Sequence, residues 1–176
     1  MQVKFINEKK FLKYNFKTKP YQHQYDVFEK SKNKKYYALF MEQGTGKSKV
    51  IIDNIAYLYR KGDIDTAIIA APKGVYRNWY ASEFKAHMPE DVVTFTDMCI
   101  WNPKETKTNV DRLIEFLRPS HKLKFFIINI EALSTEKGKN YLQRLLNVSK
   151  SFFCIDESTN IKNRTARRTK ACMKLG

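Results

Sequence analysis

Cysteine is scarce in this sequence, and its three cysteines suit neither a disulfide framework nor a metal site. Cys99, Cys154 and Cys172 are odd in number and show none of the close spacings typical of zinc ligands. A secreted protein of this size held by disulfides is therefore excluded. A reducing compartment is the simplest expectation.

Long hydrophobic runs are also missing. No apolar stretch approaches the ~20 residues that a helix needs to cross a bilayer. The first ten residues, MQVKFINEKK, lack the apolar core of a secretory signal. Internal repeats and low-complexity segments are absent as well. We expect one cytoplasmic domain of 176 residues without a membrane partner.

Acidic residues are few relative to basic ones. Asp and Glu number 18 against 33 Lys and Arg, which gives a formal net charge of +15. Such an excess predicts a polyanionic partner such as nucleic acid. Because the lysines are spread widely, a merely basic, soluble surface is the alternative. Hydrophobic residues make up 43% of the chain, so it is expected to fold rather than stay disordered.

What is present is an alternation of short apolar runs and helical patterns. Near-continuous apolar strands that alternate with helices predict a three-layer α/β domain with a mostly parallel central sheet. Short edge strands are expected within residues 1–16, and an irregular segment at 96–108. The expected strands are residues 36–41, 66–71, 92–95, 124–130 and 151–155, and the expected helices are 21–30, 47–62, 75–87, 109–117 and 139–148.

A glycine turn lies between the first of these strands and the helix that follows it. Gly44-Thr45-Gly46 would leave backbone N–H groups facing the turn, where the helix dipole also favours an anion. Lys47 adds a full positive charge for terminal phosphates, and the Ser48 hydroxyl is placed to hold Mg²⁺. The first glycine of the long pattern GxxxxGK[ST] is missing. A glycine turn followed by a solvated lysine is therefore the alternative to a phosphate-binding loop.

A pair of acids follows the last apolar strand. Asp156 would hold Mg²⁺, and Glu157 would orient and deprotonate an attacking water. In open α/β sheets ligands bind beyond the carboxyl ends of the strands, where both this pair and the glycine turn fall. A solvated turn is the alternative for the acids alone. Together with GTGKS they predict ATP binding and hydrolysis.

Five segments resemble the motifs of superfamily 2 helicases, and in particular those of the Swi/Snf-like double-stranded DNA translocases and their bacteriophage relatives. The similarity runs from about residue 20 to residue 174. The segments are PYQHQ at 20–24, GTGKS at 44–48, APKGVYRNW at 71–79, NIEAL at 129–133 and DESTNIKN at 156–163.

The resemblance implies that residues 19–176 form the first RecA-like lobe, preceded by an extension at 1–18. It implies ATP and Mg²⁺ as ligands, Gln24 as the residue that reads adenine, and Glu157 as the catalytic base beside Lys47. Ser158-Thr159 replaces the Ala-His that the family usually has, which puts the coupling to DNA in doubt. No second lobe follows, so weak nucleotide binding and poor hydrolysis are expected of this chain.

Several basic and polar residues are candidates for contact with nucleic acid. Three follow strand ends, and three arginines share one face of a basic segment, for which a solvated helix is the alternative. Contacts to the phosphate backbone carry affinity without sequence information, so double-stranded DNA is expected to bind without sequence preference. The six residues are Lys73, Arg77, Asn129, Arg164, Arg167 and Arg168.

Two other functions remain open. A non-hydrolysing nucleic-acid-binding module could retain the helicase fold, and the Thr159 substitution and the missing lobe favour it. A small nucleotide kinase would need an arginine-rich lid and a monophosphate pocket, and the sequence shows neither. The usage of lysine, asparagine and aromatic residues suggests a bacteriophage or a bacterial source.

Overall fold

A computed structural model describes residues 4–104 and 106–156 of the chain. The described residues divide into two compact units. The first unit comprises residues 4–63 and 81–94, and the second comprises residues 64–80 and 95–156 without residue 105. The short helical turns of residues 76–87 run from the second unit into the first: α4 (Tyr76–Asn78), the π-helical η1 (Trp79–Glu83) and α5 (Phe84–His87).

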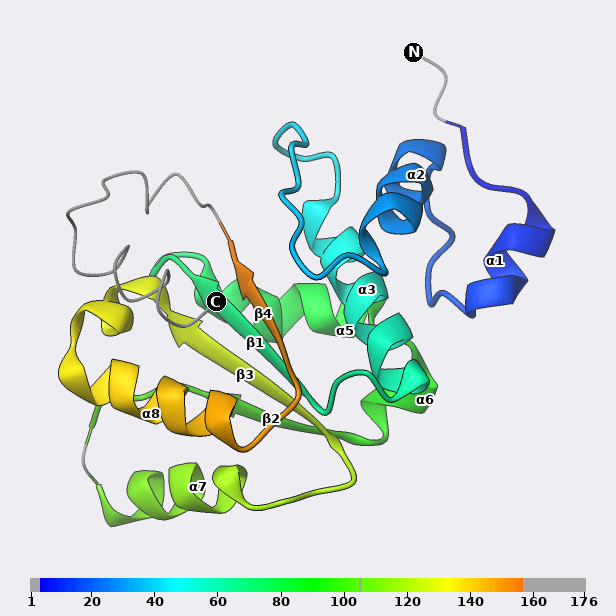
Figure 1. Cartoon of the computed structure of the whole chain (residues 1–176). Helices are drawn as coiled ribbons and strands as arrows, with labels where there is room; N and C mark the ends of the chain where they lie inside the picture. The colour runs from blue at the N-terminus through cyan, green and yellow to red at the C-terminus, as the bar shows by residue number, and fades with distance from the viewer. Residues whose placement is uncertain (1–3, 105, 157–176) are drawn as a thin grey trace. The chain divides into compact units, whose positions relative to one another are not determined.

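The second unit is built on a parallel four-stranded sheet with the order β2-β3-β1-β4 (Figure 1). Ala71 pairs with Asn129, and Ala70 pairs with Ile155. The carboxyl ends of β1, β3 and β4 therefore lie at the same edge of the sheet. The strands are β1 (Thr66–Ala71), β2 (Thr96–Ile100), β3 (Leu123–Asn129) and β4 (Ser151–Ile155).

Two amphipathic helices cover one face of this sheet. Figure 1 shows α7 (Lys107–Leu117) and α8 (Glu136–Asn147) running along it, and the 3-10 turn η2 (Ile130–Ser134) leads from β3 to α8. Each helix begins at a threonine whose side chain accepts a backbone N–H three residues on, which fixes its start. The shared core contains Ile68, Phe126, Ile128, Leu113, Leu142 and Leu145.

The first unit is helical and has a small aromatic core. Residues from the start of the chain, from α2 and from α3 form this core, so the segment before residue 19 packs with the helices after it. The helices are α1 (Glu8–Tyr14), α2 (Gln22–Ser31), α3 (Lys47–Lys61), α5 and α6 (Glu90–Val93). The buried core residues are Ile6, Phe16, Tyr25, Phe28 and Val50.

The predicted α/β class with a parallel sheet is confirmed. β1 and β4 have the predicted bounds, and β3 lies one residue earlier than expected. The expected helices at 21–30 and 47–62 are α2 and α3, and Gly62 ends α3 in the left-handed conformation. None of the helices in the described part of the chain has the length and hydropathy to cross a membrane.

The strand expected at residues 36–41 is wrong. These residues form no ladder with any strand that the structure describes. Leu39 and Met41 pack against the core of the first unit, whereas Phe40 between them is 96% exposed. An apolar run becomes a strand only where a neighbouring strand takes its backbone hydrogen bonds. Here two side chains pack against the core, and the segment forms no described strand.

Two further expectations near strand boundaries are wrong. Residues 90–93 form the helical turn α6, which Pro89 precedes and whose first turn carries Glu90 and Asp91, and the strand begins later, at Thr96. The sequence analysis missed this strand because it contains the polar residue Asp97. Polar side chains are tolerated in β2 because this strand lies at the edge of the sheet. The edge strands expected within residues 1–16 are replaced by α1 and one isolated bridge between Phe5 and Tyr21.

Candidate functional site

The glycine turn leads into α3 through two residues that need positive φ. Gly44 has φ +77° and Gly46 has φ +86°, a region that side chains with a Cβ seldom adopt. Between them, the Thr45 hydroxyl donates to the Glu42 carbonyl at 2.6 Å. The result is a tight loop whose last glycine is the N-cap of α3.

The N-terminus of α3 carries positive charges, which destabilise an isolated helix. Among the described residues, no side chain caps it, and its first turn has no acid. Lys47 and Lys49 stand there instead, next to the positive end of the helix dipole. Cations at this end are unfavourable, and although Asp53 already pairs with Lys49, an anion in the loop would compensate Lys47. The arrangement therefore suits an oxyanion such as phosphate.

Lys47 is held inside the loop rather than in solvent. Its ammonium donates to the carbonyls of Met41 and Glu42, each at 2.9 Å. Ser48, the next residue, is half-buried in the first turn of α3. Lys47 thus bonds to the segment before the glycine turn and Ser48 lies in the first turn of α3, and their binding of phosphate and Mg²⁺ stays a prediction.

Gln24 joins α2 to the same loop. The residue is 5% exposed, and its Nε2 donates to the Thr45 carbonyl at 3.1 Å. Its Oε1 accepts the Tyr21 N–H, also at 3.1 Å. An amide has two N–H donors and two acceptor lone pairs, so one of each remains for a ligand. A Cβ on Gly46 would come within 2.3 Å of Nε2, so glycine is needed for this contact.

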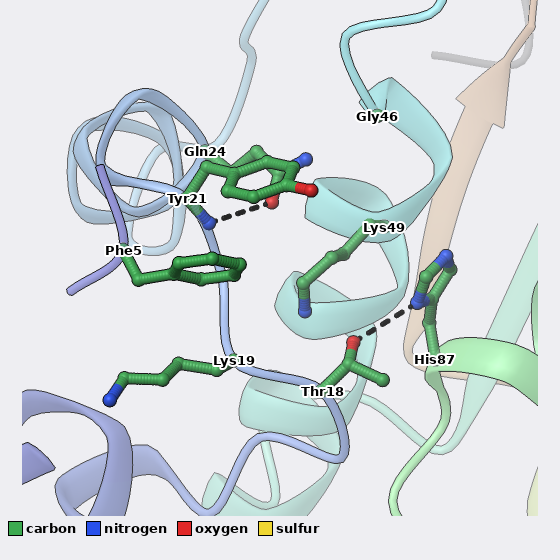
Figure 2. A pocket seen from close by; sticks show the side chains of 8 residues that line it. All are labelled: Phe5, Thr18, Lys19, Tyr21, Gln24, Gly46, Lys49 and His87. Atoms are coloured by element: carbon green, nitrogen blue, oxygen red, sulfur yellow. Dashed lines mark hydrogen bonds between the residues drawn. The ribbon is translucent and has the colours of Figure 1, made fainter. Parts of the chain in front are cut away.

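A cavity of about 370 Å³ lies beside Gln24 within the first unit (Figure 2). The rings of Phe5 and Tyr21 form part of its wall, with centroids 4.6 Å apart. Lys49 from α3 points into the space between them and His87 in Figure 2. The volume is in the range of small-molecule sites. The other lining residues are Thr18, Lys19, Gln24 and Gly46.

The charged groups around this cavity include a buried ion pair and a histidine that is neutral at pH 7. Lys49 is 4% exposed, and its ammonium lies 2.9 Å from Asp53 Oδ2. Burial raises the pKa of Asp53 to about 6, although Lys49 acts in the opposite direction. Burial also lowers the pKa of His87 to about 4, with help from the charges of Lys49 and Lys17. His87 is therefore neutral at pH 7, where its ring shares a 3.2 Å hydrogen bond with the Thr18 hydroxyl.

Asp156 is held at the end of β4 in the second unit. Its backbone N–H donates to the Ala70 carbonyl at 2.8 Å, and its Oδ2 accepts the indole N–H of Trp79 at 2.8 Å. Trp79 is 1% exposed, and a buried indole N–H requires such an acceptor. Trp79 thus orients the carboxylate, a role that the sequence analysis missed because the partners are 77 residues apart.

Two of the candidate nucleic-acid residues lie at the same edge of this sheet as Asp156. Asn129 ends β3, where its amide donates to Glu131 at 3.3 Å, and exposed Lys73 follows β1. Arg77 is exposed on α4 and contacts the Tyr76 hydroxyl. The structure thus brings Asn129 and Lys73 to the edge that carries Asp156.

The predicted site residues lie in different parts of the chain. Gln24 and the glycine turn belong to the first unit, whereas Asp156, Lys73, Arg77 and Asn129 belong to the second. Glu157 and Ser158-Thr159 lie outside the described residues, as do Arg164, Arg167 and Arg168. The described part of the chain has no cluster of three or more His, Cys, Asp or Glu side chains that could hold a metal. Mg²⁺ bound with a nucleotide needs only one or two carboxylates, and a carboxylate such as that of Asp156 has the right chemistry for it.

The chain matches the model of a known protein family. A family model described as type III restriction enzyme, res subunit, matches residues 8–174, nearly the whole chain. No curated protein matches the chain. The match includes the glycine turn, Gln24 and Asp156, and it begins within the segment before residue 19.

Proposed function

Because this chain belongs to the family described as type III restriction enzyme, res subunit, and is a helicase-like ATPase lobe of superfamily 2, we propose that it serves an ATP-driven DNA translocase or helicase. The lobe hydrolyses ATP with Mg²⁺ when a second RecA-like lobe completes the site. The motifs favour a Swi/Snf-like translocase, and we propose a bacterial or bacteriophage source and a cytoplasmic location for it.

The observation that carries this proposal is the N-terminus of α3. A 15-residue helix starts at a left-handed glycine, without a side-chain cap among the described residues, and with lysines in its first turn. That combination costs stability unless a polyanion binds there. A triphosphate supplies the charge, and Lys47 and the loop amides supply the donors.

The nucleotide would supply the phosphoanhydride bond that is hydrolysed, and Mg²⁺ would supply a divalent positive charge. Ser48 and Asp156 would hold the metal with their oxygens, which are the ligands that Mg²⁺ prefers. The Trp79 hydrogen bond keeps the Asp156 carboxylate in one orientation. Glu157 would orient and deprotonate the attacking water.

The cavity beside Gln24 supports adenine as the base. The free N–H and lone pair of the Gln24 amide match the donor and acceptor at the adenine edge. The rings of Phe5 and Tyr21 offer apolar walls for the base. Because Gln24 also holds the Thr45 carbonyl, base binding and loop geometry are linked through one side chain.

Double-stranded DNA is the proposed track, bound through its phosphates. Lys73 and Arg77 are exposed near the carboxyl edge of the sheet, and Asn129 lies at that edge. Contacts to phosphates carry affinity without sequence information, so binding without sequence preference is expected. Arg164, Arg167 and Arg168 are proposed as further contacts.

The test compares this chain with a protein in which a second lobe follows it. ATP hydrolysis is measured with and without double-stranded DNA at several salt concentrations. We expect DNA-stimulated turnover in the two-lobe protein, about three to five decades above the single lobe if an arginine finger is supplied. Glu157→Gln should abolish turnover while DNA binding persists. DNA binding without turnover in either form would instead indicate a non-hydrolysing binding module.

A further inference from the structure

A second cavity, of about 340 Å³, lies in the second unit at the sheet edge opposite to Asp156. It is formed by the beginnings of β2 and β3 and by the end of α7. Lys124 and Asn129 lie five positions apart on β3, which separates the two edges by about 16 Å. The lining residues used below are Met98, Arg112, Phe116, Arg118, Pro119 and Lys124.

Lys124 is a buried cation without a carboxylate partner in the described part of the chain. The residue is 6% exposed, and its ammonium donates to the Arg118 carbonyl at 2.5 Å. The ring of Phe116 lies 5.9 Å away. Burial lowers the pKa of Lys124, although Asp65 and Asp97 act against this shift. Buried charges are normally paired, so this ammonium has donors left for an anion.

Arg112 supplies a second cation to the same cavity. Its Nη2 donates to the Met98 carbonyl at 3.0 Å, and no ion pair to a described carboxylate accompanies that bond. The two acids in the lining are already engaged. Asp97 pairs with Lys122 at 3.1 Å, and Glu115 pairs with Arg118 at 2.6 Å. Arg112 and Lys124 are therefore the two cations of this cavity that form no ion pair with a described carboxylate.

We propose that this cavity binds a small organic anion, with a phosphate or carboxylate group between Arg112 and Lys124. A guanidinium and an ammonium together offer the planar fork and the point charge that such oxyanions take. Met98, Phe116 and Pro119 form an apolar wall for the body of the ligand. The proposed anion site is separate from Asp156, because Lys124 lies near the start of β3 whereas Asn129 ends that strand at the edge that carries Asp156.

The test titrates the chain with phenyl phosphate and, separately, with benzoate. The side-chain Nε–H signals of the arginines are followed by NMR, and affinity is taken from the same titration. We expect the Arg112 signal to move, and Arg112→Gln or Lys124→Met to weaken binding about ten- to a hundredfold. The tighter of the two probes identifies the anionic group.

Controls separate this site from the glycine turn and from bulk charge. Lys47→Ala removes phosphate binding at the turn and should leave the Arg112 response intact. Arg144→Gln removes an exposed cation on α8 and should change nothing. If only the amide signals of Gly44 and Gly46 move, or if Arg112→Gln binds as tightly as the native chain, the proposal is wrong. Lys124→Met should fold, since an apolar side chain replaces a buried charge. If Lys124→Met does not fold, the binding affinity of Arg112→Gln alone tests the proposal.

Discussion

Gly46→Ala is expected to weaken ATP binding by about two orders of magnitude. The new Cβ would lie 2.3 Å from Gln24 Nε2, at a residue whose φ is +86°. The loop of the free variant relaxes out of this conformation, and ATP binding then has to restore it, at about 1–2 kcal/mol for the backbone and about 1 kcal/mol for the lost Gln24 hydrogen bond to the Thr45 carbonyl. The measurement is a fluorescence titration with an ATP analogue in the presence of Mg²⁺, after circular dichroism has confirmed folding.

Gly44→Ala is the matched control for this prediction. Gly44 also has positive φ, at +77°, but a Cβ there meets no atom within 4 Å. Its effect should be confined to backbone strain and therefore be roughly tenfold or less. The double variant Gln24→Ala with Gly46→Ala removes the clash and should therefore be more stable than Gly46→Ala, but it should not regain the affinity, because the Gln24 amide is lost as well. Equal losses in both single variants would show that the contact with Gln24 does not matter.

Lys49→Met is expected to lower the free energy of unfolding at pH 7 by about 3–5 kcal/mol. It removes the partner of Asp53, which is 3% exposed and whose Oδ1 already has no hydrogen-bond partner in the described structure. Combining it with Asp53→Leu should restore most of the stability, since an apolar pair replaces a buried ion pair. Urea denaturation measures all three forms.

The pH dependence of the Lys49→Met loss follows from the raised pKa of Asp53. This pKa is about 6 in the folded chain against an ordinary value of 3.8, so the folded state binds the proton more tightly. Stability then increases as the pH falls from about 6 toward 4, and the loss in Lys49→Met should shrink at pH 5. Lys61→Met is the control: this exposed lysine pairs with Asp63 near the end of the same helix, and its loss should change the free energy of unfolding far less than Lys49→Met does. A double variant no more stable than Lys49→Met would contradict the prediction.

Local patterns predicted much of the fold. β1 and β4 are short apolar runs that end at a proline or an acid, and α3 runs from a glycine turn to a glycine C-cap. These features depend on neighbours in sequence, so a single chain displays them. The segment at residues 36–41 has the same apolar character, but its pairing depends on a distant strand edge that the sequence does not display.

In the candidate site, too, some features are visible in the sequence and others appear only in the folded chain. The glycine turn and Asp156 were identified because their residue types sit at fixed spacing within a motif. The Trp79 contact with Asp156 and the Thr18 contact with His87 join residues 77 and 69 positions apart. Neither pair has a local signal. The cavity near Gln24 and the unpaired cations Arg112 and Lys124 likewise emerge only when the chain is folded.

The most direct test of the central claim is whether this chain binds Mg·ATP through Lys47. The affinity of the native chain is compared with that of Lys47→Ala, and with Lys61→Ala as a change of the same kind at the other end of α3. A phosphate-binding loop predicts saturable binding that weakens about a hundredfold in Lys47→Ala and is unaffected in Lys61→Ala. Binding that is equal in all three forms, or absent in the native chain, would contradict a nucleotide site at the glycine turn.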